Sequence, residues 1–138
     1  MSEQLYELAR PFPESLIKQK PGAFKAAYVE HSVVVQRLLE VTGPFTFRVD
    51  ELIRDADGVV CGCLASLEVV IDGRPVVIRE VGDVEHPQSG NAGGNAKAAA
   101  SDAMKRCAAR LGLGLHLWSG ENFYLDKALA KRQDTSSE

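Results

Sequence analysis

Basic side chains on one predicted helix are the residues of this sequence best suited to bind a ligand. An alanine-rich stretch carries Lys97, Lys105, Arg106 and Arg110. At about 100° per residue, the last three cations fall with Asp102 on one helix face, opposite the apolar face. Such a face predicts binding of an anion such as phosphate. An ordinary solvated surface is the simpler explanation of a lone Lys-Arg pair, so further observations must decide.

The same stretch has the features of a helix that packs closely on a sheet. Its apolar face is built mainly from small side chains: Ala96, Ala99, Ala100, Ala103, Met104, Cys107 and Leu111. Small side chains let the helix backbone lie close to its neighbour. Asn95 is predicted to cap the start of the helix, and Gly112 its end, with Gly114 reinforcing the stop.

Residues 102–115 carry a specific motif, Asp-Ala-Met-Lys-Arg-Cys-Ala-Ala-Arg-Leu-Gly-Leu-Gly-Leu. This segment resembles the signature of the Rad52-type single-strand annealing proteins, including their phage-encoded relatives. Weaker similarities lie at Phe12-Pro13-Glu14 with Ile17, at Lys25-Ala-Ala-Tyr28-Val29-Glu30, at Gly43-Pro44-Phe45 and at Gly82. Together they cover Leu8 to Leu129, which is nearly the whole chain.

The resemblance implies a protein that binds single-stranded DNA and anneals complementary strands in homologous recombination or DNA repair, without ATP. It also implies an oligomeric ring with a DNA-binding groove, and a single-strand binding protein or a recombinase as a protein partner. The implied phosphate ligands are Lys105 and Arg106, followed by Lys97, Arg110, Lys25, Lys18 and Tyr28.

Three positions qualify these implied roles. Asp102 is expected to orient the cations, because a carboxylate repels phosphate. Val33 and Ala109 stand where members of the family carry basic residues. Arg110 is adjacent to the second of these positions but points about 100° away on a helix, so the contacts in the groove would be redistributed.

The composition predicts one compact domain over residues 1–132, followed by a polar tail over 133–138. A chain of 138 residues with 45% hydrophobic content can bury one core. Its net charge of −3 is unevenly distributed, since acids outnumber bases between Asp55 and Ala96, whereas bases outnumber acids from Lys97 onward. A local basic stripe is what phosphate binding requires, and the whole-chain charge does not report it.

The sequence predicts no catalytic constellation, so the protein is not expected to be an enzyme. Cys61, Cys63 and Cys107 are expected to be small buried hydrophobes, because an odd number with two on one strand does not suit a disulfide framework. The three histidines follow no metal-ligand spacing, so no metal or other cofactor is expected. Neither a secretory signal nor a membrane-spanning stretch is recognisable, which predicts a cytoplasmic protein. The resemblance to phage-encoded relatives implies a bacterial cell or phage-infected host.

Hydrophobic periodicity predicts an α+β fold with a helix, a three-stranded antiparallel sheet and a long helix. The resemblance implies that subunits of this fold form an oligomeric ring. The expected elements are a short helix over Leu5–Arg10, a helix from about Ser32 to Gly43-Pro44, and strands over Phe45–Ile53, Val59–Ile71 and Arg74–Val81. Asp72-Gly73 predicts a tight hairpin. Because unpaired sheet edges invite a neighbouring subunit, ring contacts are expected at Leu5–Ile17 and Phe123–Leu129.

Other classes of nucleic-acid-binding protein stay open at this point. A double-stranded RNA binding module shares the order of elements and reads the duplex by its shape. A single-strand coater of the oligonucleotide-binding barrel type requires more strands and several exposed aromatics. ATP binding is disfavoured, because Asn95 and Ala96 separate Lys97 from the preceding glycines and Ala98 stands where a phosphate-binding loop needs Ser or Thr.

Overall fold

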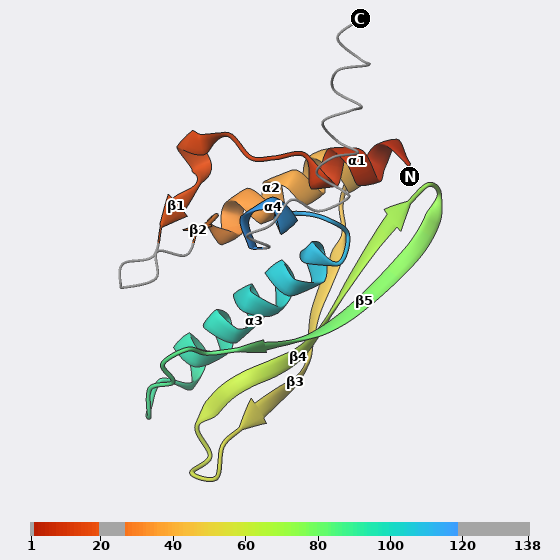
Figure 1. The fold of residues 1–138 in the computed structure, drawn as a ribbon. Helices are drawn as coiled ribbons and strands as arrows, with labels where there is room; N and C mark the ends of the chain where they lie inside the picture. Colours follow the sequence, from red (N-terminus) through yellow and green to blue (C-terminus); the bar gives the residue numbers. More distant parts are fainter. Residues whose placement is uncertain (1, 20–26, 119–138) are drawn as a thin grey trace, which may run out of the picture.

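The chain folds as one long helix packed across a twisted three-stranded sheet, with shorter helices gathered at one end (Figure 1). The computed structural model describes residues 2–19 and 27–118, apart from the side chains of His116 and Trp118. In chain order the elements are α1 Glu3–Ala9, the 3-10 helix η1 Glu14–Leu16, β1 Lys18–Gln19, β2 Ala27–Tyr28, α2 His31–Thr42, β3 Thr46–Arg54, β4 Val60–Ile71, β5 Arg74–Asp83, α3 Ala92–Ala109 and α4 Leu115–Trp118. The predicted α+β order of helix, three strands and helix is confirmed.

The sheet has the predicted antiparallel order β3-β4-β5. Its centre is β4, in which Cys63, Ala65, Leu67, Val69 and Ile71 are all buried on one face. Asp72 and Gly73 join β4 to β5 with φ angles of 52° and 76°, the left-handed conformation that a tight hairpin requires. The period-two pattern therefore predicted the core face of the central strand correctly.

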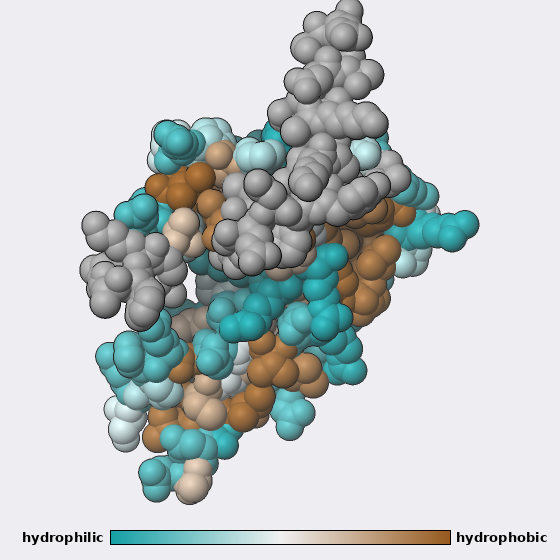
Figure 2. All heavy atoms as spheres, in the orientation of Figure 1, coloured by the Kyte–Doolittle hydropathy of each residue, from teal (hydrophilic) through white to brown (hydrophobic). Residues whose placement is uncertain are grey.

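Strand β3 departs from the predicted burial. Val49 and Ile53 are 44% and 37% exposed, although their alternation predicted a buried face. A register shift between Val49 and Glu51 interrupts the pairing with β4, and α3 packs mainly against β4 and β5. Figure 2 shows hydrophobic patches over the strands of the sheet. Val70 of β4 and Val77 and Val81 of β5 are exposed as well, on the sheet face away from α3.

Helix α3 lies on the sheet at unusually short range because three small residues meet there. An ideal Cβ placed on Gly82 of β5 would lie 2.1 Å from the carbonyl oxygen of Ala99 and 2.6 Å from the backbone nitrogen of Ala103. Both alanines are fully buried, and they share a core cluster with Cys63 and Ala65 of β4. The predicted role of the small apolar face of α3 is thus confirmed.

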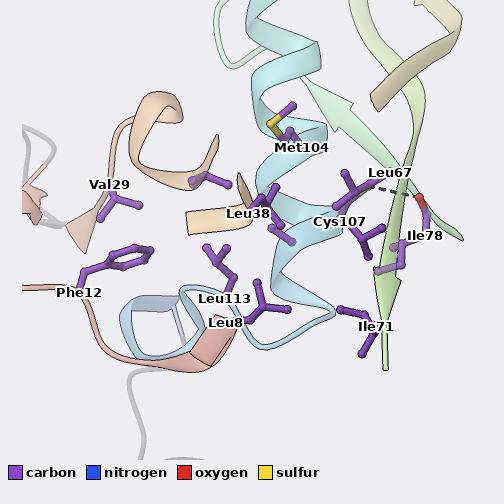
Figure 3. Close-up of a cluster of buried hydrophobic side chains, with 13 residues drawn as sticks. Leu8, Phe12, Val29, Leu38, Leu67, Ile71, Ile78, Met104, Cys107 and Leu113 are labelled. Carbon is purple, nitrogen blue, oxygen red and sulfur yellow. Dashed lines mark hydrogen bonds between the residues drawn. The ribbon is translucent and has the colours of Figure 1, made fainter. Parts of the chain in front are cut away.

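A second, larger core joins the C-terminal half of α3 to α1 and α2 (Figure 3). Leu8 and Phe12, which are 0% and 6% exposed, lie in the same cluster as Leu38 and Leu113. Leu8 and Phe12 are thus covered by their own chain, and the contact of the segment Leu5–Ile17 with a neighbouring subunit stays a prediction.

Buried cysteines complete the two cores. The Sγ of Cys107 donates to the carbonyl oxygen of Ile78 at 3.6 Å, and burial raises the pKa of this thiol to about 11. Cys63 is likewise buried and free, as predicted, whereas Cys61 is partly exposed. These thiols pack as small apolar groups.

The two ends of α3 differ in how well the sequence predicted them. The helix starts at Ala92, and the side chain of Asn91 caps it by accepting from the Gly94 nitrogen at 3.3 Å. Asn95, predicted as the cap, is a buried helical residue whose amide exchanges two hydrogen bonds with the backbone of Gln88. Gly93 and Gly94 take helical conformation here, so the helix begins about one turn before the predicted start.

At the other end, Gly112 closes the helix as predicted. Its φ is 95°, and its nitrogen donates to the carbonyl of Ala109 while the Leu113 nitrogen donates to that of Ala108. This pair of bonds is a Schellman motif with glycine in the left-handed position.

We predict that Gly82→Ala destabilises the protein by about 3 kcal/mol or more, because its methyl group would overlap the backbone of α3. Gly93→Ala is the matched control, since a Cβ there meets nothing within 4 Å and alanine favours the helix. Urea unfolding of the two variants provides the comparison. Equal unfolding midpoints would show that α3 does not pack against Gly82.

Candidate nucleic-acid interface

The close packing of α3 fixes which way each of its cations points. Lys105 and Arg106 are adjacent in sequence and thus about 100° apart around the helix. Lys105 faces β2 and the start of α2, whereas Arg106 faces β5. The single cationic face expected from the helical wheel is therefore divided into two flanks of different character.

One side, the Lys105 flank, consists of Lys97, Ser101 and Lys105 of α3 together with Tyr28 and His31. The three α3 residues follow one another at four-residue spacing, so they form one ridge of the helix. The Nζ of Lys105 lies 5.7 Å from the centroid of the Tyr28 ring, a cation–π contact. The Oγ of Ser101 lies 3.1 Å from the Nδ1 of His31.

The short strand pair β1–β2 brings a further cation to this flank. Lys18 pairs in register with Tyr28, and its Nζ forms an ion pair with Glu30. The hydrogen bond and charge of Lys18, and more weakly the charge of Lys105, hold the pKa of Glu30 below its ordinary value. Among the described residues named on this flank, the cations Lys18, Lys97 and Lys105 thus outnumber the one carboxylate, Glu30.

The other side, the Arg106 flank, consists of Asp102, Arg106 and Arg110 of α3 with Glu80 and Asp83 of β5. The Nε of Arg106 donates to Asp102 Oδ2 at 2.9 Å, and its Nη2 lies 3.9 Å from Asp83 Oδ1. The Nε of Arg110 donates to Glu80 Oε1 at 2.5 Å. Each guanidinium on this flank therefore already has a carboxylate partner.

Asp102 organises the Arg106 flank, as the sequence predicted. Besides holding Arg106, it accepts a 3.0 Å hydrogen bond from the backbone nitrogen of Asp83. Burial opposes ionisation of Asp102, but this bond and the Arg106 guanidinium outweigh it and keep the pKa of the carboxyl below its ordinary value. The carboxylate thus links α3 to the end of β5.

The predicted site residues are only partly brought together. Lys105, Tyr28 and Lys18 are neighbours, and Lys97 lies on the same ridge, while Arg106 and Arg110 are on the other flank. Lys25 lies outside the described residues, as do Phe123–Leu129 and the tail.

Sequence reasoning missed His31 and Ser101. Ser101 stands four residues before Lys105, so the helical pattern could have placed it on the ridge. Its contact with His31 spans 70 positions and has no sequence signal.

The described residues hold no group of three His, Cys, Asp or Glu side chains that could bind a metal ion. None of their helices combines the length and apolar character that crossing a membrane demands.

The fold and the two flanks define a helix-on-sheet domain that carries a basic ridge beside an aromatic ring. The family pattern of the Rad52/22 double-strand break repair proteins matches residues 1–136, which is almost the entire chain. The chain belongs to this family, and its function is in double-strand break repair and recombination. A comparison with curated proteins gives no match.

We predict that Asp102→Asn removes a contribution to stability that depends on pH. Because the folded state holds the pKa of Asp102 below its ordinary value, the carboxylate stabilises the fold at neutral pH, and this stabilisation is lost as pH falls through the folded pKa. Urea unfolding should show the wild type more stable at neutral pH, with the two proteins converging once pH has fallen through the lowered pKa of Asp102. Asp57→Asn, on the exposed β3–β4 turn, should keep the wild-type pH dependence. A difference in the free energy of unfolding between the wild type and Asp102→Asn that stays constant with pH would contradict this role of the Asp102 carboxylate.

Proposed function

We propose that this protein binds single-stranded DNA along the Lys105 flank and anneals complementary strands without nucleotide hydrolysis or any other chemical step. The observation that carries this proposal is the ridge of Lys97, Ser101 and Lys105 beside Tyr28, in a member of a double-strand break repair family. A strand with one phosphate per nucleotide matches a row of cations, and an aromatic ring can stack on a base. The protein would act in the cytoplasm of a bacterial cell or phage-infected host.

Annealing follows from contacts to the backbone alone. Phosphate contacts fix the path of a strand without reading its sequence. They also neutralise charge that opposes the approach of a second strand. A strand held by its phosphates can therefore leave its base edges open for pairing.

The two flanks contribute differently to such a site. The Lys105 flank has an excess of cations over carboxylates among the described residues. The negative charge of a bound phosphate would therefore offset this excess positive charge. Arg106 reaches a phosphate only by exchanging its contacts with Asp102 and Asp83. We therefore propose Lys105 and Lys97 as the main ligands, with Arg106, Arg110, Lys18, Lys25 and Tyr28 as further contacts.

Assembly into a homo-oligomer belongs to the same proposal. Within the described chain, β3 and β5 are the outer strands of the sheet, and Val77 and Val81 of β5 are 57% and 50% exposed. Open strand edges and apolar side chains favour pairing with another copy. Repetition around a ring would also join the short Lys105 flanks into a continuous groove.

We predict that Lys105→Ala lowers the affinity for every single-stranded sequence alike and reduces the log–log salt slope by about 0.7. Arg106→Ala should lower affinity less, because carboxylates already hold its guanidinium. Arg79→Ala is the charge-matched control, since Arg79 pairs with Asp50 at 3.6 Å on the sheet face away from α3. Fluorescence-anisotropy titrations over a range of salt concentrations compare these three variants with the wild type. An unchanged slope in a folded Lys105→Ala, Arg106→Ala double variant would remove α3 from the binding surface.

We predict that the protein accelerates annealing of complementary oligonucleotides in excess chelator and without ATP. The residues at the start of α3 lack the spacing of an ATP-binding loop, and backbone contacts require no metal. A fluorescence-quenching assay with dye-labelled strands measures the rate. Activity that is abolished by chelator and restored only by nucleotide with metal would overturn the mechanism.

We predict a large homo-oligomer at low micromolar concentration. Light scattering coupled to size exclusion measures its mass with and without single-stranded DNA. A monodisperse monomer that stays monomeric on adding DNA would contradict the ring and favour the double-stranded RNA binding module instead.

A further inference from the structure

One polar contact between α2 and α3 lies directly beside the proposed DNA-binding cations. His31 is the first residue of α2, and its Nδ1 lies 3.1 Å from the Oγ of Ser101. Ser101 stands between Lys97 and Lys105 on the ridge of α3. The contact therefore holds an imidazole at the edge of the Lys105 flank.

Charged and titratable groups approach His31 from each neighbouring element. Lys105 lies on α3, Glu30 precedes His31 in the chain, and Lys18 of β1 pairs with Glu30. Tyr28 of β2 carries the ring that Lys105 contacts. Burial, and after it the charge of Lys105, lower the pKa of His31, so the imidazole is neutral at neutral pH.

We propose that His31 is a further phosphate contact of the Lys105 flank and that it takes up a proton when single-stranded DNA binds. This inference rests on the proposed function, because the phosphate it invokes is that of the bound strand. It adds to the site a group whose charge can change near neutral pH.

The partner of His31 suits both of its protonation states. A serine hydroxyl can donate to the Nδ1 of a neutral imidazole, and it can accept from the same atom once that atom is protonated. In both cases the Nε2, on the other side of the ring, carries a proton and can donate to a phosphate oxygen. Ser101 is thus a positioning residue that keeps the imidazole in place while its charge changes.

A bound phosphate should change the proton affinity of His31 in a defined direction. Its negative charge offsets the effect of Lys105, so the pKa of His31 is higher in the complex than in the free protein. The affinity for the strand must then rise as pH falls through the His31 pKa of the complex, and it must level off below the His31 pKa of the free protein. Each unit of difference between the two corresponds to a tenfold gain in affinity.

Binding of a fluorescent oligonucleotide at constant salt, from about pH 8 to about pH 5, tests the inference. The wild type should gain affinity as pH falls, and His31→Gln should show a much flatter profile. His86→Gln is the matched control, because His86 lies on the exposed loop after β5, 4.0 Å from Glu85, and its loss should leave the profile unchanged. An equal pH dependence in the wild type and in His31→Gln would overturn the inference while leaving the proposed function intact.

A second measurement does not depend on a folded His31→Gln variant. An NMR titration of the assigned His31 ring proton in the wild type gives its pKa with and without the oligonucleotide. A rise on adding DNA supports the proposal, and an unchanged value overturns it. A protein that binds no single-stranded DNA at any pH would instead overturn the proposed function.

Discussion

The approach of α3 to β5 at Gly82 is the constraint on which the rest of the structure depends. The backbone of α3 lies so near this glycine that no Cβ fits between them. A helix held this closely through Ala99 and Ala103 cannot rotate about its axis without overlap. Its rotation decides that Lys105 points toward β2 while Arg106 and Arg110 point toward β5.

A buried arginine anchors α2, the helix that contributes His31 to the Lys105 flank. Arg37 of α2 is 5% exposed and donates to the carbonyl oxygens of Glu7, Leu8 and Arg10, where α1 ends. Its guanidinium also lies 4.3 Å from the centroid of the Phe12 ring. Carbonyls at a helix C-terminus carry partial negative charge, so they compensate the buried cation.

These contacts tie α1 and the segment after it to α2. Because His31 begins α2, and Tyr28 lies just before it in the chain, the anchoring of α2 also sets where these two residues meet α3. The flank is therefore built from three separate parts of the sequence that the two cores hold together.

Much of the fold could be predicted because its signals are local. The alternation along β4, the Asp72-Gly73 hairpin and the Gly112 stop each depend on neighbouring residues, and each was predicted correctly. The burial of β3 was not, because its exposure depends on which strands α3 covers. Asn91 rather than Asn95 caps α3 because two glycines adopt helical conformation, which their intrinsic preference disfavours.

The candidate site was predictable in residue type but not in arrangement. The motif with Lys105 and Arg106 identified the helix, and the resemblance named Tyr28 and Lys18, near the preceding helix, as further candidates. The division of the cations between two flanks depends on Glu80 and Asp83, which lie on a strand distant in sequence. The contact between His31 and Ser101 likewise exists only in the folded chain.

In the proposed function, the backbone of single-stranded DNA lies along the ridge of Lys97 and Lys105. Acetylation of lysine side chains, followed by mass spectrometry with and without bound oligonucleotide, tests it most directly. Lys97 and Lys105 should both become less reactive when the strand is bound. Unchanged reactivity of these two lysines in a protein saturated with single-stranded DNA would contradict it.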